Sequence, residues 1–183
     1  TGKVSDLPLS ALRELDAGTR FGEKFRGEKL PTLNEVFEAV GGKMRINVEL
    51  KNYARPFDDL TRRVIKLTEQ FHLEESVLLS SFNPINLSKA HNINPKIQRG
   101  LLVSPADQRM LGGLGRLFPY QALHPYYEDV TREMTEQLHA RGKQLNTWTV
   151  DDPQALLRLR AFGVDGIICN NPAAARAVLE GRT

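Results

Sequence analysis

The chain has 183 residues, of which 40% are hydrophobic and 26% charged, and its formal net charge is +3. These values are typical of a single soluble globular domain, and they argue against a disordered or fibrous protein. Lys and Arg are scattered among nearly as many Asp and Glu, so we expect no nucleic-acid partner. Apolar runs fall short of the ~18 residues of a membrane span, so we expect no stable membrane insertion.

The first clear helix signal lies at Thr32-Leu33-Asn34-Glu35, which has the spacing of a capping box. Gly41-Gly42 is expected to end that helix. Residues 1–44 are therefore predicted to form a helical segment at the start of a single domain that spans 1–183. The single Cys169 cannot form an intrachain disulfide, so it is interpreted as a buried spectator thiol of a cytoplasmic protein.

From Arg45 onward, short runs that suit buried strands alternate with helical patterns, which predicts six β/α units over residues 45–183. The spacing of about 20 to 30 residues between the runs is that of a parallel sheet. The predicted strands are Arg45 to Lys51, Ser76 to Phe82, Ile97 to Val103, Gln121 to Pro125, Gln144 to Val150 and Val164 to Asn170.

The helices between these strands carry their own signals. Phe57, Leu60, Val64, Leu67 and Phe71 are predicted to form one apolar helix face. Thr131 is expected to cap a later helix that stops at Gly142. Asp152-Pro153 and Asn171-Pro172 each place an N-cap acceptor before a proline at the first helical position. The run Leu111 to Gly115 is interpreted as a loop.

These elements predict an α/β fold of the TIM (β/α)₈ barrel type. A complete barrel takes ~250 residues and eight β/α units, so the first two units are expected to be missing from the sequence. An open, doubly wound parallel sheet is the competing architecture, because alternation of strands and helices does not show whether the sheet closes.

The strand Ile46-Asn47-Val48-Glu49-Leu50-Lys51 is the most informative stretch for function. Its side chains alternate across the strand, so Glu49 and Lys51 are expected to face the barrel interior together. The carboxyl ends of barrel strands are where barrel enzymes build their sites. A salt bridge that fills the barrel is an equally good interpretation of this pair.

Other candidate residues lie at the ends of later strands. Phe82, His124 and Trp148 each close a predicted strand, where they could belong either to the core or to a site. Together with Glu49 and Lys51 they predict a pocket for a small ligand with an anionic centre.

Several segments, in order, resemble the glycerophosphodiester phosphodiesterase family. Asn47-Val-Glu-Leu-Lys51 is similar to the family's metal-binding "NIELK" strand, and Leu30-Pro-Thr-Leu-Asn-Glu-Val36 to its "IPTLEEV" stretch. The remaining matches are Gly2 to Gly18, Ser80-Ser-Phe82, Trp148-Thr-Val150 and Gly163-Val-Asp-Gly-Ile-Ile168.

The resemblance implies a barrel that hydrolyses small-molecule glycerophosphodiesters to glycerol 3-phosphate and an alcohol. It implies a divalent cation, Mg²⁺ or Ca²⁺, with Glu49 as a metal ligand. Lys51 matches a catalytic residue that stabilises charge on phosphate oxygens. Trp148 matches an aromatic residue that shapes the substrate pocket, and Phe82 and His124 are predicted to bind substrate beside it.

The sequence also departs from the family. The family's His-Arg-Gly strand, its Glu-x-Asp strand and its catalytic His-Asp pair are not matched by His72, His91, His124 or His139. Of these, His72, His91 and His139 are expected to be exposed. The final strand ends in Cys169-Asn170-Asn171-Pro172, whereas the family commonly has Thr-Asp-x-Pro there, so a charge is lost while the helix cap is kept.

Without the family's general acid and base, the chain by itself is expected to be inactive. Two alternatives stay open. The chain could be a non-catalytic barrel remnant or binding module, or belong to a related phospholipid phosphodiesterase such as a lysophospholipase D or a sphingomyelinase D-like enzyme. An incomplete barrel would also leave strand edges that favour a homo-oligomer.

Overall fold

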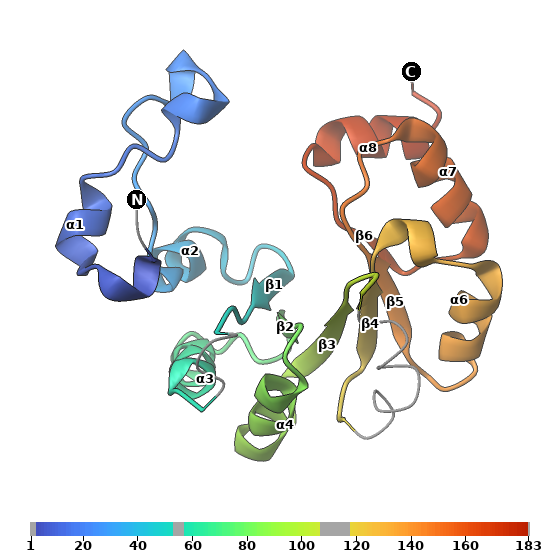
Figure 1. Cartoon of the computed structure of the whole chain (residues 1–183), viewed down its shortest axis with the longest axis horizontal. Coiled ribbons are helices and arrows are strands. Elements are labelled where there is room, and N and C mark those ends of the chain that lie inside the picture. Colours follow the sequence, from blue (N-terminus) through green and yellow to red (C-terminus); the bar gives the residue numbers. More distant parts are fainter. Residues whose placement is uncertain (1–2, 53–56, 107–117, 183) are drawn as a thin grey trace. The chain divides into compact units, whose positions relative to one another are not determined.

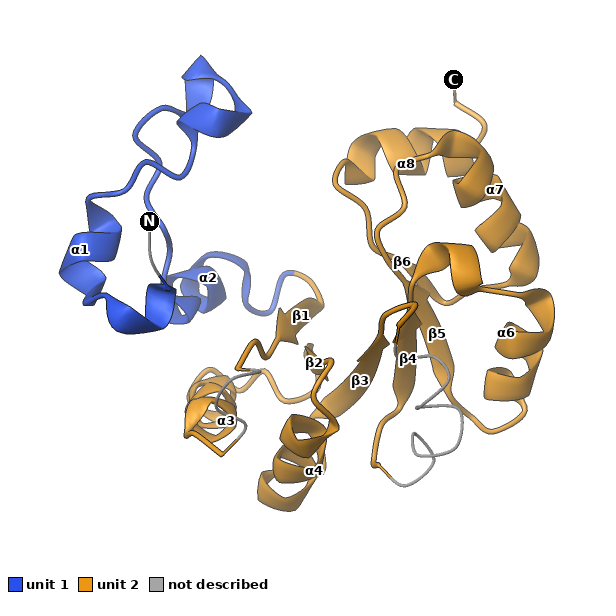
Figure 2. Cartoon of the chain, viewed as in Figure 1, with its two compact units in different colours: residues 1–43 blue, residues 44–183 orange. Residues whose placement is uncertain are grey.

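The computed structural model describes residues 3–52, 57–106 and 118–182, so the predicted loop from Leu111 to Gly115 lies outside the described residues. The chain divides into two compact units, Thr1–Lys43 and Met44–Thr183 (Figure 2). Each unit is described by itself below.

The first unit consists of short helices and a loop that is held together by hydrogen bonds to Asp16. The carboxylate of Asp16 accepts hydrogen bonds from the backbone N–H groups of Gly18, Thr19 and Gly27, and one from the Thr19 hydroxyl. The Thr19 hydroxyl and these N–H groups hold the pKa of Asp16 well below its usual range. The helical elements are η1 (Val4–Asp6), α1 (Leu9–Arg13), η2 (Thr19–Phe21), η3 (Glu23–Phe25) and α2 (Leu33–Val40).

The predicted capping box at the start of α2 is confirmed. The Thr32 hydroxyl accepts from the Glu35 N–H at 3.3 Å, and the Glu35 carboxylate accepts from the Thr32 N–H at 2.7 Å. Two otherwise unpaired backbone donors are thereby satisfied. The helix ends at Gly41, as the Gly41-Gly42 pair predicted.

The second unit contains all six predicted strands in one parallel sheet (Figure 1). The strands lie side by side in chain order, and every neighbouring pair is parallel. A doubly wound sheet reverses its strand order at a switch point, whereas barrel strands follow one another, so the doubly wound alternative is wrong. The strands are β1 (Ile46–Glu49), β2 (Val77–Ser81), β3 (Gln98–Val103), β4 (Ala122–Pro125), β5 (Gln144–Thr147) and β6 (Gly166–Ile167).

The last strand is shorter than the predicted run from Val164 to Asn170. The Val164 N–H still bonds the Leu159 carbonyl of the preceding helix at 3.4 Å, so strand geometry begins later. At the other end, the Asn170 N–H turns to the Asp151 carboxylate at 2.8 Å instead of continuing the ladder.

Helices follow the strands on the outer side of the curved sheet (Figure 1). The predicted caps are confirmed: Thr131, Asp152 and Asn171 each accept a hydrogen bond from a backbone N–H of the first helical turn. Asn83-Pro84 is a third case of the cap-and-proline device. The elements are α3 (Leu60–Gln70), α4 (Pro84–Ile93), η5 (Tyr127–Asp129), α6 (Arg132–His139), α7 (Pro153–Phe162) and α8 (Pro172–Leu179).

The predicted apolar face of α3 is wrong at its first member. Phe57 is 80% exposed and precedes the helix, which begins at Leu60. The carboxylate of Asp58 accepts from the Leu60 N–H at 3.0 Å and so starts the helix after Phe57. Instead of packing in the core, the Phe57 ring lies under the Lys89 ammonium, which is 5.5 Å from the ring centroid.

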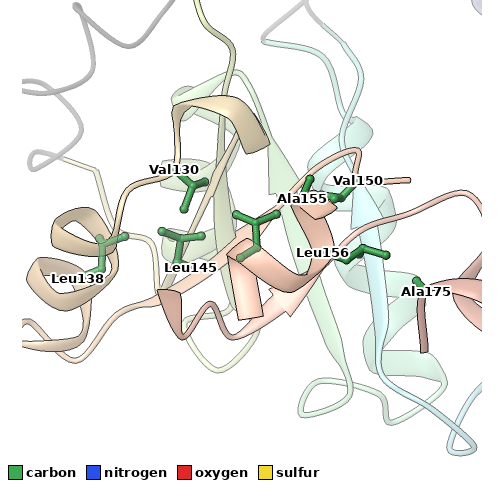
Figure 3. Packing of buried hydrophobic residues seen from close by; sticks show 8 residues of the cluster. Val130, Leu138, Leu145, Val150, Ala155, Leu156 and Ala175 are labelled. Carbon is green, nitrogen blue, oxygen red and sulfur yellow. The ribbon is translucent and has the colours of Figure 1, made fainter. Parts of the chain in front are cut away.

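The largest described core cluster lies between β5 and the helices α6, α7 and α8 (Figure 3). Leu145 of β5 and Leu159 of α7 are fully buried there, and Leu123 of β4 packs against the same cluster. These contacts identify the face of the sheet that turns toward the helices. The opposite face is the interior face, on which the candidate site is built.

Candidate functional site

The register of β1, β2 and β3 places Glu49 on the interior face. Glu49 pairs with Ser80, and Ser80 pairs with Gly100. Paired residues of parallel strands point the same way. The space where Gly100 would carry a Cβ is filled by His124, whose Nε2 atom would lie 2.6 Å from it. These four residues therefore share the face opposite to the helix-covered cluster.

Glu49 and Lys51 form an ion pair at the end of β1, with 3.4 Å between Oε2 and Nζ. Their side chains are 29% and 67% exposed, respectively. Two residues apart on an extended segment, they lie on one side, as predicted. The alternative interpretation, a salt bridge that fills the barrel, also predicted an ion pair between these residues. An ion pair this exposed, however, adds at most about 1 kcal/mol to stability and does not fill a core.

His124 lies deeper on the same face than its position at a strand end suggested. Its side chain is 1% exposed, and its Nε2 atom lies 3.1 Å from Nδ2 of Asn146. Because the amide nitrogen donates, Nε2 accepts and the proton sits on Nδ1, a buried atom without a hydrogen-bond partner in the described structure. Burial lowers the pKa of His124 to about 4, so the imidazole is neutral at pH 7.

Asn146 continues this interior row toward β6. A Cβ on Gly166 would lie 2.4 Å from its Oδ1 atom, just as one on Gly100 would strike His124. Two glycines thus make room for two polar side chains. Sequence reasoning missed Asn146, although the amides at alternate positions 144 and 146 of the strand Gln144–Thr147 were a signal for a polar interior face.

The aromatic candidates come together at the carboxyl ends of β2 and β5. The ring centroids of Phe82 and Trp148 lie 5.5 Å apart in an edge-to-face arrangement. The indole Nε1 of Trp148 donates to the His124 carbonyl at 2.8 Å, which ties the ring to β4. Tyr126, whose ring centroid is 5.7 Å from that of Trp148, joins this wall and was not predicted. Its signal was its place directly after His124-Pro125.

The departure at the final strand has a structural counterpart. Asn170 donates its backbone N–H and its side-chain Nδ2 to the two carboxylate oxygens of Asp151, at 2.8 and 2.6 Å. A negative charge is therefore present beside residue 170, carried by the end of β5. Asn171 keeps the helix cap, since its Oδ1 accepts from the Ala174 N–H at 3.1 Å.

A buried polar network behind Lys51 was also missed. Asn86 of α4 donates to Asn52 Oδ1 at 2.5 Å and to the Ser81 hydroxyl at 3.1 Å. Thr61 of α3 donates to Asn86 Oδ1 at 3.3 Å. All four side chains are buried. The available signal was an asparagine between two apolar residues, in Ile85-Asn86-Leu87.

The remaining histidines and the cysteine lie away from these residues. His72, His91 and His139 are exposed, as predicted, and His139 Nε2 lies 2.9 Å from an Asp165 carboxylate oxygen. Cys169 is only partly buried, which corrects the prediction of a buried thiol. Desolvation raises the pKa of this thiol.

Over the three described stretches of chain, no three His, Cys, Asp or Glu side chains gather closely enough to hold a metal ion. Glu49 is an oxygen donor of the kind that Mg²⁺ and Ca²⁺ prefer. Helices long and apolar enough to cross a bilayer are likewise absent from the residues that the structure describes.

Known proteins resemble this chain over nearly its whole length. A glycerophosphodiester phosphodiesterase of Caldanaerobacter subterraneus is 37% identical over 93% of this chain and 70% of the relative. One of Bacillus altitudinis is 30% identical over 98% of this chain and 74% of the relative.

Solved structures have the same fold. An Oleispira antarctica phosphodiesterase, solved in complex with the product sn-glycerol-3-phosphate, matches with a TM-score of 0.84 and 26% identity over 98% of this chain and 73% of that one. A glycerophosphodiester phosphodiesterase of Parabacteroides distasonis matches with a TM-score of 0.76 and 24% identity, over 96% of this chain and 71% of that one. Residues 1–174 match the glycerophosphoryl diester phosphodiesterase family, and the chain therefore belongs to that family.

Proposed function

We propose that this chain serves the hydrolysis of glycerophosphodiesters to glycerol 3-phosphate and an alcohol, with the help of a divalent cation. The observation that carries the proposal is the Glu49–Lys51 pair on the interior face at the end of β1. A carboxylate and an ammonium 3.4 Å apart offer one group to a cation and the other to a phosphate oxygen. Family membership and the product complex of the Oleispira relative support the same substrate class.

The chemistry of Glu49 fits a hard cation. Its carboxylate is partly exposed and so remains accessible to an ion and to water. Mg²⁺ and Ca²⁺ take about six or more oxygen ligands, so Glu49 would hold such an ion together with other oxygen donors. When bound, the cation would neutralise charge on the phosphate oxygens.

Lys51 is proposed to act on the phosphate itself. Its ammonium stabilises the negative charge that builds up on the phosphate oxygens as the attacking oxygen adds and the alcohol leaves. Because Lys51 is 67% exposed, its side chain can turn from Glu49 to a bound phosphate.

The aromatic wall of Phe82, Tyr126 and Trp148 is proposed to line the side of the pocket that takes the apolar part of the substrate. The edge-to-face contact and the indole hydrogen bond keep Trp148 in place. His124, buried and neutral, supports this wall from beneath through its carbonyl. Direct contact of the His124 ring with substrate remains a prediction.

The general acid and base are proposed to be other residues than the four histidines of the chain, which are His72, His91, His124 and His139. None of them matches the family's catalytic motifs in sequence, and His124 is sealed from solvent. We therefore expect the 183 residues alone to be inactive and the full-length gene product to be active on glycerophosphocholine with Mg²⁺ or Ca²⁺. Turnover by the isolated chain at the same rate would contradict this expectation.

The test of the proposal is Glu49→Ala in the full-length gene product. Removal of the carboxylate should lower metal-dependent turnover of glycerophosphocholine by about 1000-fold, because the cation and the phosphate charge are no longer held together. Glu75→Ala is the matched control, an exposed glutamate before β2. Unchanged turnover in Glu49→Ala would reject the proposal. Release of choline without any need for metal would also reject it.

Association of the chain is a separate proposal. In the described sheet, β1 and β6 are the outermost strands. Open strand edges attract further strands, so we expect the isolated 183 residues to dimerise or aggregate in light scattering. A stable monomer would contradict this proposal.

A further inference from the structure

We propose that Asn86, a buried residue of α4, is a positioning residue for Lys51. The inference rests on the role proposed for Lys51 and adds a residue that the family motifs do not include. It is carried by a buried hydrogen-bond network that holds the backbone of Leu50 before Lys51 and the side chain of Asn52 after it.

The side chain of Asn86 is fully buried and makes three of the four hydrogen bonds open to an amide. Its two amide hydrogens go to Asn52 Oδ1 at 2.5 Å and to the Ser81 hydroxyl at 3.1 Å, and its oxygen accepts from the Thr61 hydroxyl at 3.3 Å. A buried amide held by three hydrogen bonds, two donated and one accepted, is fixed in one orientation. Four segments of the chain are thereby joined through one side chain.

Ser81 links Asn86 to the residue before Lys51. Its hydroxyl donates to the Leu50 carbonyl at 2.9 Å, and accepts from Asn86 and from the Asn83 N–H at 3.1 Å. The Leu50 N–H is bonded to the Ser80 carbonyl at 2.7 Å. Leu50 is therefore held at both of its backbone polar groups.

Asn52, the residue after Lys51, is held through its side chain. Its side chain accepts from Asn86 and donates to the Asp58 carboxylate at 2.7 Å. Lys51 thus lies between two clamped neighbours, while its own side chain is 67% exposed. An exposed lysine has many conformations, so a fixed backbone origin is what limits the region its ammonium can reach.

Asn86 lies in the first turn of α4, and burial of its amide is costly unless the amide is hydrogen-bonded. A leucine at position 86 would also suit the buried side of α4, where the neighbouring Leu87 is fully buried. We therefore assign to the polar network the task of fixing the chain at the end of β1, where it bonds Leu50 and Asn52. Placement matters in this position, because a displacement of about 1 Å in a catalytic group lowers rates by as much as 100-fold.

The experiment uses Asn86→Asp in the full-length gene product. The substitution keeps the size and the acceptor for Thr61 but replaces the donor to Asn52 and Ser81 by an acceptor. We expect kcat for glycerophosphocholine to fall by about 10- to 100-fold with KM changed by less than about 3-fold, since transition-state charge is affected more than binding. We also expect hydrogen exchange at the Leu50 amide to become at least about 10-fold faster.

Thr68→Val is the matched control for lost stability. Thr68 of α3 is also fully buried, and its hydroxyl bonds only within the helix, to the Val64 carbonyl at 2.9 Å. It should leave kcat and the Leu50 amide unchanged. Asn52→Ala is the second variant in case Asn86→Asp does not fold, because Asn52 is the least buried member of the network. It should show the same fall in kcat and the same faster exchange at the Leu50 amide.

A double-mutant cycle separates positioning from a general effect. In a Lys51→Met background, Asn86→Asp should reduce kcat by less than about 2-fold further, because the group that it positions is gone. Losses that multiply, or Leu50 exchange no faster than in Thr68→Val, would overturn the inference while leaving the proposed function intact. If Lys51→Met itself leaves kcat unchanged, the role of Lys51 fails and the inference fails with it.

Discussion

Two polar regions lie on the interior face of the sheet, and they handle charge in opposite ways. At the end of β1, Glu49 and Lys51 keep full opposite charges in partly exposed positions, 3.4 Å apart. At β4 and β5, His124 and Asn146 are neutral, and the imidazole is 1% exposed. The first region is open to solvent, and the imidazole of the second is closed off from it.

The difference separates function from stability. An exposed ion pair contributes little to folding, so its presence at a strand end is better explained by chemistry than by packing. A buried imidazole is kept neutral because the cost of burying its charge is high, so its contribution to stability depends on pH. Substitutions in the two regions should therefore move different observables.

Lys51→Met should produce the largest effect and confine it to activity. Removal of the ammonium is expected to reduce turnover of glycerophosphocholine by about 100- to 1000-fold, as for other groups that stabilise charge in the transition state. The free energy of unfolding should change by less than about 0.5 kcal/mol, because the side chain is 67% exposed. Kinetics and urea unfolding of the full-length gene product measure both.

Lys66→Met, on the exposed side of α3, is the control for this experiment. It should match the unmodified protein in both measurements. A Lys51→Met protein that keeps its turnover but unfolds more readily would reverse the assignment of the two regions.

His124 should produce the second effect, and confine it to stability at low pH. Its pKa is about 4 in the folded chain, against 6.5 for an unburied histidine, because of desolvation. Above pH 6.5 both states are neutral and the stability is fully present. As the pH falls from 6.5 to 4 the unfolded chain binds the proton first, so about 3 kcal/mol of stability is lost, and the loss levels off below pH 4.

The measurement is the free energy of unfolding from pH 8 to pH 4, compared with that of His124→Phe. The exposed pair of His139 and Asp165 is the same in both proteins, so the difference between the two curves belongs to His124. Curves that run parallel would show that the imidazole is not held neutral by burial.

Gly100→Ala should destabilise the interior row by about 1 to 3 kcal/mol. The new methyl group would lie 2.6 Å from His124 Nε2 and 2.7 Å from its Cε1, and the ring is held in place by Asn146. In a His124→Ala background the same substitution should cost less than about 0.5 kcal/mol, because the clash is removed. Thermal unfolding of the four proteins measures the coupling, and equal costs in both backgrounds would place His124 elsewhere.

Local patterns explain why so much of the fold could be predicted. Alternation of β-rich runs and caps such as Thr32, Thr131 and Asp152 depends on residues close in sequence, and all six strands and these caps are confirmed. Phe57 was misplaced because the Asp58 carboxylate, which bonds the Leu60 N–H, decides where α3 begins. Apolar spacing alone carries no information about such a start.

The site was predicted where it depends on one strand and missed where it depends on several. Glu49 and Lys51 share a face because they are two apart in an extended segment. The Asn86 network joins α3, α4 and the end of β1, and the depth of His124 depends on the missing side chain of Gly100. Contacts of this kind require the register of neighbouring strands, which periodicity does not supply.

Phe82→Leu should have the smallest effect and test the boundary between the two regions. Phe82 lies edge-to-face against Trp148, whose indole is bonded to the His124 carbonyl, so the aromatic wall joins the rim to the sealed interior. Loss of the ring contact should cost about 1 kcal/mol. Trp148 is the single tryptophan of the chain, so its fluorescence reports this contact directly. We expect a shifted emission maximum with the pH dependence of stability unchanged, because the imidazole stays buried on Gly100. A change in that pH dependence would mean that Phe82 seals His124 from water, and the wall would then belong to the interior rather than to the rim.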